Sequence, residues 1–128
     1  MKYYLSKILN ESFEESISSV TEELKREGFG ILTEIDVEDT LKEKLDVDFR
    51  KYKILGACNP PLAHKALQAE SRIGLMLPCN VIVQDVGGGK TEVAAVDPFV
   101  MMQSINNPDL GEIANEVQTK LKNVIDAL

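Results

Sequence analysis

Three times along this chain, a strand-like segment leads into a helix that begins at a capping residue. The caps are Ser12, Asp36 and Asn59, and each is followed by apolar residues that recur every three or four positions. Strand-like sequences precede these caps, in residues 2–9, 29–36 and 52–58. Amphipathic helices between half-buried strands must cover a sheet, so this order restricts the chain to folds in which helices pack on a sheet.

The first helix has the clearest signals. Ser12 and Glu15 form an S-x-x-E capping box, and Gly28 stands where a left-handed residue commonly ends a helix. The apolar stripe of this helix has steps of four, three and four residues: Phe13, Ile17, Val20 and Leu24. Alternation in the next strand predicts one face that holds Phe29, Ile31, Thr33 and Ile35 and an opposite face that holds Glu34 and Asp36.

The second half of the chain predicts a hairpin and a long final helix. Strands are expected at residues 75–86 and 90–97, joined by the glycines of residues 87–89, and Pro78 confines the start of the first strand to an edge or a bulge. Asp97 and the proline after it end the second strand and begin a short helical turn. The last helix has an apolar stripe with alternating steps of four and three: Leu110, Ala114, Val117, Leu121, Val124 and Leu128.

The predicted order of elements is β-α-β-α-β-α-β-β-α, in a single domain of residues 1–128. One hairpin and several helical crossovers predict a mixed five-stranded sheet, and alternating strands predict that helices cover mainly one of its faces. The expected fold class is therefore an α+β two-layer sandwich. The other face of the sheet must then meet water or another subunit.

Composition argues against several classes of function. The net charge of −7 repels polyanions, and the chain has no tryptophan and only 5% aromatic residues, so nucleic acid is not an expected partner. No segment approaches the run of about 18 apolar residues that spans a bilayer, and the start "MKYYLSKILNESFEES" lacks the apolar region of a secretory signal. We therefore expect a cytoplasmic protein that does not bind membranes.

Four longer phrases of the chain resemble a known family. In their order and spacing, "GFGILTEID", "LGACNPPLAHKAL", "GLMLPCNVIV" and "AAVDP" are similar to the bacterial and archaeal family catalogued as domain of unknown function 302. The resemblance implies a compact α+β fold, usually a dimer, with no established activity. The shared phrases fall on Asn59-Pro60, Pro78 and Asp97-Pro98. Many relatives have a small or apolar residue in place of Cys58 and Cys79, which implies that the family is not built around these thiols.

The stretch "ACNPPLAH" holds Cys58 and the only histidine of the chain, His64. Cys58 precedes a helix N-terminus, which favours a thiolate, and a Cys–His couple is the minimum for nucleophilic catalysis. Pro60 and Pro61, however, remove two of the amide donors that would hold an anion there. A partly buried cysteine beside a helix that Asn59 caps is therefore the favoured interpretation.

Cys79, Asn80 and Asp97 complete the set of candidate ligand-binding residues, with Cys58, Asn59 and His64. If the third and fourth strands are neighbours, the two cysteines approach each other, and with the histidine they offer two thiolates and an imidazole to a soft metal. The asparagines and Asp97 are either polar groups around one pocket at the strand ends or caps that satisfy local backbone. Caps are the more common role.

These observations favour a non-catalytic binding or accessory module that works as a homodimer, with no cofactor and with a small-molecule ligand that the sequence does not name. Two alternatives stay open. One is a thiol-dependent redox protein or enzyme in which Cys58 is the nucleophile. The other is soft-metal binding through Cys58, Cys79 and His64.

The stripe of the last helix generates a first prediction. We expect it to be mostly buried, with Val117 near its middle. The substitution Val117→Asp would then place an unpaired charge in apolar surroundings, and we expect it to lower the free energy of unfolding by several kcal/mol. Thermal unfolding measures the loss, and an unchanged melting temperature would show that the stripe faces solvent.

Overall fold

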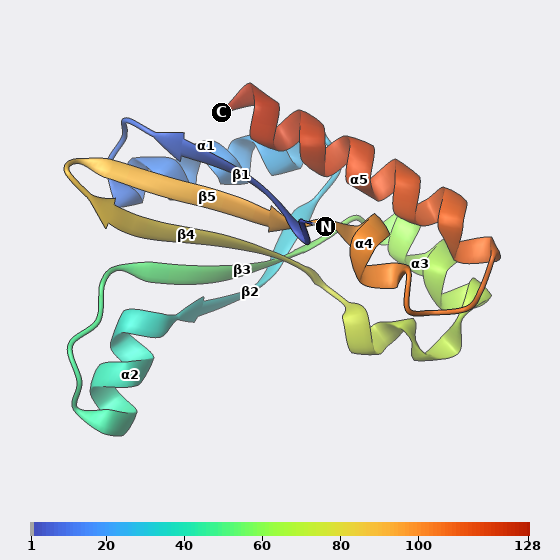
Figure 1. Ribbon diagram of the computed structural model, residues 1–128, viewed down its shortest axis with the longest axis horizontal. Helices are drawn as coiled ribbons and strands as arrows, with labels where there is room; N and C mark the ends of the chain where they lie inside the picture. The colour runs from blue at the N-terminus through green and yellow to red at the C-terminus, as the bar shows by residue number, and fades with distance from the viewer. Residues whose placement is uncertain (1) are drawn as a thin grey trace.

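A computed structural model describes residues 2–128 as one five-stranded sheet with helices packed against it (Figure 1). The strands are β1 (Tyr4–Leu9), β2 (Gly30–Asp36), β3 (Tyr52–Cys58), β4 (Cys79–Gly87) and β5 (Lys90–Val96). The helices are α1 (Phe13–Arg26), α2 (Val37–Leu45), α3 (Pro60–Ala69), α4 (Pro98–Met102) and α5 (Asp109–Ala127), with a 3₁₀ helix, η1, at Ser71–Met76. The α+β class and the expected order of the elements are confirmed.

Every pairing in the sheet is antiparallel, so the prediction of a mixed sheet is wrong. The strand order is β1-β5-β4-β3-β2. The helices α2 and α3 connect strands that are antiparallel neighbours, and therefore act as long hairpin connections rather than as crossovers between parallel strands. Only α1 joins two strands of the same direction, and these lie at opposite edges of the sheet.

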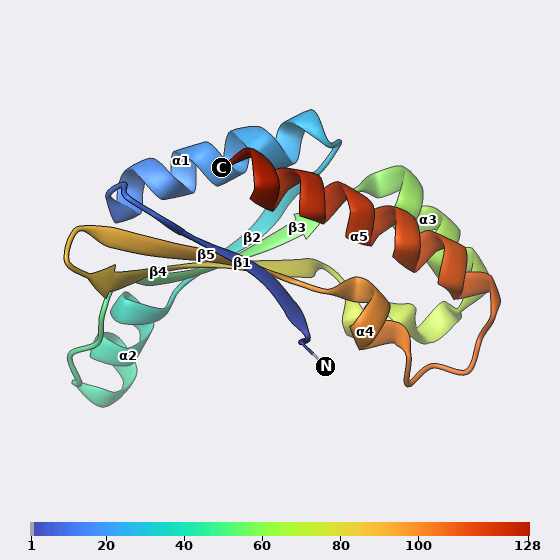
Figure 2. The ribbon, with the colours of Figure 1, turned by 45° about the horizontal axis from the view of Figure 1, so that its top comes forward.

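The helices α1 and α5 cover one face of the sheet, and their apolar stripes form the main core with it (Figure 2). Leu55, Val81, Val83 and Val93 point into this core from the strands and are fully buried. The stripe of α5 is buried from Leu110 to Val124, as the sequence predicts, and Leu128 is half-buried. Lys7 on β1 donates to the backbone carbonyl of Asp126 at 3.2 Å, which holds the end of α5 on the sheet.

The strand β2 departs from simple alternation. Its pairing with β3 shifts between Ile31 and Thr33, where Leu32 bulges out and is 67% exposed. Ile31 packs against the core, whereas Thr33 and Ile35 lie on the other face of the sheet. The prediction that these residues share one face is therefore wrong, because one extra residue in a bulge reverses the side on which every later residue lies.

The capping and turn residues predicted from the sequence form the expected hydrogen bonds and backbone conformations. The Ser12 hydroxyl accepts a hydrogen bond from the Glu15 N–H at 3.1 Å, and Asp36 accepts one from the Asp39 N–H at 2.9 Å. Gly28 adopts a φ of 85° just after α1, which glycine reaches at little cost. The triple glycine forms the β4–β5 turn. These contacts explain why the sequence alone places the helix starts correctly.

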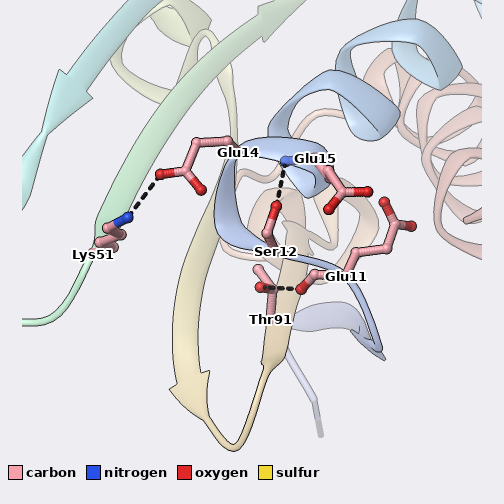
Figure 3. A network of polar contacts seen from close by, with 6 residues as sticks. All are labelled: Glu11, Ser12, Glu14, Glu15, Lys51 and Thr91. Atoms are coloured by element: carbon pink, nitrogen blue, oxygen red, sulfur yellow. Dashed lines mark hydrogen bonds and ion pairs between the residues drawn. The ribbon is translucent and has the colours of Figure 1, made fainter.

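Two further contacts attach the first turn of α1 to the sheet (Figure 3). The Thr91 hydroxyl donates to the Glu11 carbonyl at 2.9 Å, and the Lys51 ammonium lies 2.7 Å from the Glu14 carboxylate. The ion pair raises the pKa of Lys51 and lowers that of Glu14, mainly through the hydrogen bond between them. Both side chains are in solvent, so the pair orients the helix more than it stabilises the fold.

The bulge makes Gly56 of β3 a position where a side chain does not fit. A Cβ there would lie 2.1 Å from Thr33 Oγ1 and 2.7 Å from Pro78 Cγ. We expect Gly56→Ala to cost about 1–3 kcal/mol, because both neighbours must shift. The matched control is Gly30→Ala in β2, where a Cβ meets no heavy atom within 4 Å. Urea unfolding compares the two variants, and equal midpoints would contradict the close packing at Gly56.

Candidate functional site

Asn59 is buried at the junction of β3 and α3, where its side chain connects two helices. Its Oδ1 accepts a hydrogen bond from the Leu62 N–H at 3.4 Å, and its Nδ2 donates to the Glu27 carbonyl at 3.2 Å. The residue therefore caps α3, as predicted, and at the same time ties the start of α3 to the end of α1. Its polar atoms are used within the fold rather than offered to a ligand.

The structure brings the two cysteines to one place. Cys79 is buried opposite Ala57, and Cys58 is half-buried at the end of the neighbouring strand, as the sequence analysis expected. Both line a narrow, mostly apolar slot of about 30 Å³, close to the space that one water molecule needs. Burial raises the pKa of Cys79 to about 11, and the nearby Cys58 adds to the shift. Burial thus favours the neutral form of the Cys79 thiol, and the slot is too small for an organic substrate.

His64 does not join the cysteines. It is exposed on α3 and does not line the slot. Within residues 2–128, the only three ligating groups that gather within 4.8 Å of one another are Asp36, Glu38 and Asp39. These carboxylates stand at the start of α2, where negative charge complements the helix dipole. The soft-metal set suggested by the sequence is therefore not assembled in the described part of the chain.

Asp97 is also held within the fold. Its Oδ1 accepts hydrogen bonds from the N–H groups of Phe99 and Val100, at 3.0 and 3.3 Å, and so caps α4. The Gln118 amide of α5 donates to both carboxylate oxygens, at 3.0 and 2.9 Å. The carboxylate is buried and fully engaged, so its role is to fasten α4 to α5. Of the six candidate ligand-binding residues, only Asn80 lines the pocket on the face of the sheet that the main helices leave uncovered.

This uncovered surface, which we call the open face, is organised in rows across the strands. An apolar row, the central stripe, is formed by residues that lie opposite one another in neighbouring strands: Ala94, Ile82, Ile54 and Ile35. A second row beside it is more polar and runs through Ile8, Glu92, Gln84 and Tyr52. Directly opposite residues of antiparallel strands share a face, so these rows follow from the register.

The open face contains a hollow of about 480 Å³, and we call this feature the sheet hollow. All three tyrosines of the chain line it. One charged side chain, Glu92, is among its lining residues: Tyr3, Tyr4, Tyr52, Asn80, Ile82, Gln84, Glu92, Ala94, Ala95 and Val96. Its size lies within the range of about 300–1,000 Å³ that is usual for small-molecule sites. Of the two pockets, only the sheet hollow has the volume that an organic ligand needs.

A chain of polar contacts positions the side chains along one rim of the sheet hollow. Arg50 Nε donates to Gln84 Oε1 at 2.8 Å, and Gln84 Nε2 donates to Glu92 Oε1 at 2.7 Å. The Arg50 guanidinium also stacks near two aromatic rings, 4.4 Å from the centroid of Phe49 and 5.6 Å from that of Tyr52. Glu92 is thus oriented by a neutral amide and keeps its second oxygen available on the open face.

Comparison with known proteins agrees with this architecture. The family model described as "Domain of unknown function DUF302" matches residues 5–128, and the chain belongs to that family, as the sequence phrases suggest. A solved structure that it resembles is the "Crystal structure of uncharacterized conserved protein DUF302 from Bacillus stearothermophilus". The two share 31% identity over 98% of each chain, with a TM-score of 0.90. A search of curated proteins found no match. Within residues 2–128, no helix has the length and apolar character needed to cross a membrane.

The raised pKa of Cys79 generates a prediction for thiol labelling. Only the thiolate is alkylated, so in the variant Cys58→Ser the native Cys79 should react slowly, with a rate that rises about tenfold per pH unit from pH 7 to 9 and does not level off. The same variant in denaturant, where the pKa of the thiol is near its ordinary value of about 9, is the control. A plateau below pH 8 in the native protein would contradict the burial of this thiol.

The same shift has a consequence for stability. The folded state holds the Cys79 proton more tightly than the unfolded state does. The contribution of this thiol to the free energy of unfolding is therefore fully present below the pKa of about 9 that it has in the unfolded chain. We expect the free energy of unfolding to fall as the pH rises from about 9 to 11, and the Cys79→Ala variant to lack this part of the pH dependence.

Proposed function

We propose that this protein is a non-catalytic binding module that works as a homodimer, and that the two copies meet through their open faces. The central stripe is the observation that carries the proposal. It crosses four neighbouring strands: Ala94 in β5 is buried, and the three isoleucines in β4, β3 and β2 are half-buried or exposed in the single chain. Apolar surface that continues across a sheet is uncommon on monomers and marks a surface that meets a partner.

A second copy is the partner that this surface fits best. A two-fold axis lying along the central stripe places the stripe of one copy on that of the other, which makes an isologous contact. The more polar second row holds one charged residue, Glu92, and Arg50 lies beside the row and binds Gln84, so charges of both signs are present and a second copy is not repelled. Two sheets packed face to face are also a common way to bury such residues.

The helix α2 gives independent support. It lies on the side of the sheet opposite α1 and α5 (Figure 2), and it has no buried residue. Leu45 and Val47, at its C-terminal end and just after it, are 65% and 43% exposed, although both are apolar. Few contacts within the chain stabilise α2. We therefore expect its apolar residues to pack against a molecule bound to the open face.

Binding is favoured over catalysis by the chemistry of the two pockets. The cysteine slot excludes substrates by its size, and the sheet hollow offers a carboxylate, amides and tyrosines but no nucleophile paired with a base. Two free cysteines close together suit a reducing compartment, which supports the expected cytoplasmic location.

The assembly is tested by light scattering at micromolar concentration. We expect twice the monomer mass for the wild type and the monomer mass for Ile82→Asp, because the substitution places two like charges at the centre of the interface. Leu67→Asp, on the exposed side of α3, introduces the same charge away from the open face and should leave the dimer intact. Circular dichroism confirms that the variants are folded. A monomeric wild type, or dissociation by both variants, would contradict this interface.

A further inference from the structure

We infer that the sheet hollow is a site for a small organic cation, an ammonium group that carries apolar substituents. The inference rests on the proposed function, since it assigns a ligand class to the open face of a binding module. It stands on three observations within the hollow: an uncompensated carboxylate, a concentration of tyrosine rings and an apolar floor.

The carboxylate of Glu92 supplies the counter-charge. It belongs to the one charged residue that lines the sheet hollow, and it is half-buried. Within residues 2–128, no lysine, arginine or histidine nitrogen comes within 4.0 Å of it, and its hydrogen-bond donor is the neutral amide of Gln84. A partly buried negative charge without a counter-ion favours a positively charged ligand.

The tyrosines supply ring faces that attract cations. Tyr3 and Tyr4 meet edge to face with centroids 5.1 Å apart, and Tyr52 stands on another strand of the same hollow. Two of these rings already have a cation of the chain beside them, since Lys2 Nζ lies 5.4 Å from the Tyr4 centroid and the Arg50 guanidinium lies near Tyr52. A ligand cation would therefore use the Tyr3 ring or compete with Lys2 and Arg50 for the other two. Attraction between cations and aromatic faces is strongest for ligands that give up little hydration, such as substituted ammonium groups.

The floor and the overall charge fit the same ligand class. Ile82 and Ala94 of the central stripe lie between the rings, so the substituents of an ammonium group find apolar contacts there. The net charge of −7 raises the local concentration of cations around the protein. A second copy placed on the open face would close the hollow and remove water from it, which strengthens the interaction with Glu92.

An anionic ligand fits the hollow less well. Two cations of the chain lie beside rings of the hollow, Lys2 at Tyr4 and Arg50 at Tyr52, but neither residue lines the hollow, and the Nε of Arg50 is occupied by Gln84. A carboxylate or phosphate in the hollow would face Glu92 without a positive partner among the lining residues. The charge of the lining therefore selects for cations.

The test compares two probes of nearly equal shape. Choline is a quaternary ammonium, and 3,3-dimethylbutan-1-ol replaces its charged nitrogen with carbon. Isothermal titration calorimetry on the full chain should show saturable binding of choline, and binding of the neutral alcohol that is weaker by about tenfold or more. Equal affinity for the two probes, or no saturable binding of choline up to about 10 mM, would overturn the inference.

Two variants assign the binding to the hollow. Glu92→Gln removes the charge and keeps the shape, and we expect it to weaken choline binding by about tenfold or more. Glu112→Gln makes the same change in charge on an exposed position of α5, on the covered side of the sheet, and should leave the affinity within about twofold. Similar losses in both variants would show that only the net charge matters, and would overturn the site.

Light scattering on the same samples separates this inference from the proposed dimer. Loss of choline binding in a Glu92→Gln protein that remains dimeric supports the site and leaves the interface unaffected. A dimer that does not bind choline refutes the cation site alone. A monomer that binds choline through Glu92 refutes the interface alone.

Discussion

The burial of one face of an antiparallel sheet under α1 and α5 is the interaction on which the rest of this structure depends. The strand residues Leu55, Val81, Val83 and Val93 are fully buried there, and each such side chain is worth about 1.5–3 kcal/mol when removed from water. Because side chains alternate along a strand, burying these residues also places Ile54, Ile82, Gln84 and Glu92 on the opposite face. The open face is thus a direct consequence of how the core is packed.

The residues that the sequence suggested for catalysis or ligand binding mostly stabilise this packing. Asn59 and Asp97 each cap a helix whose first residue is proline, and each also accepts or donates a hydrogen bond to a more distant helix. In this way Asn59 joins α3 to α1, and Asp97 joins α4 to α5. Hydrogen bonds at strand-to-helix junctions therefore explain the phrases that the chain shares with its family at these positions.

The candidate site lies where the core leaves the sheet uncovered. The same surface carries the central stripe, through which we propose that two copies meet, and the sheet hollow, to which we assign a small cation. The two features share Ile82 and Ala94, so a ligand in the hollow would lie at the edge of the contact between the copies. A ligand held by Glu92 and the tyrosines would be enclosed only in the assembled protein, so binding and assembly would favour each other.

Most of the local structure could be predicted from the sequence, whereas the site could not. The caps at Ser12, Asp36 and Asn59 and the glycine turn depend on residues at most a few positions away, so the sequence itself determined them. The α5 stripe likewise required only the helical period. The strand signals around Tyr52, Gln84 and Glu92 were visible as well, but nothing in them showed that these three residues stand side by side.

Only the tertiary structure decided the direction of the strands, the effect of the bulge at Leu32 and the composition of the rows. Each of these depends on pairing between segments that are far apart in the chain, such as Tyr52 with Gln84 and Ile8 with Glu92. A shift of one residue in such a pairing moves every later side chain to the other face of the sheet. The sequence by itself therefore determined the elements and their buried stripes, and the register between strands decided which polar residues meet on the open face.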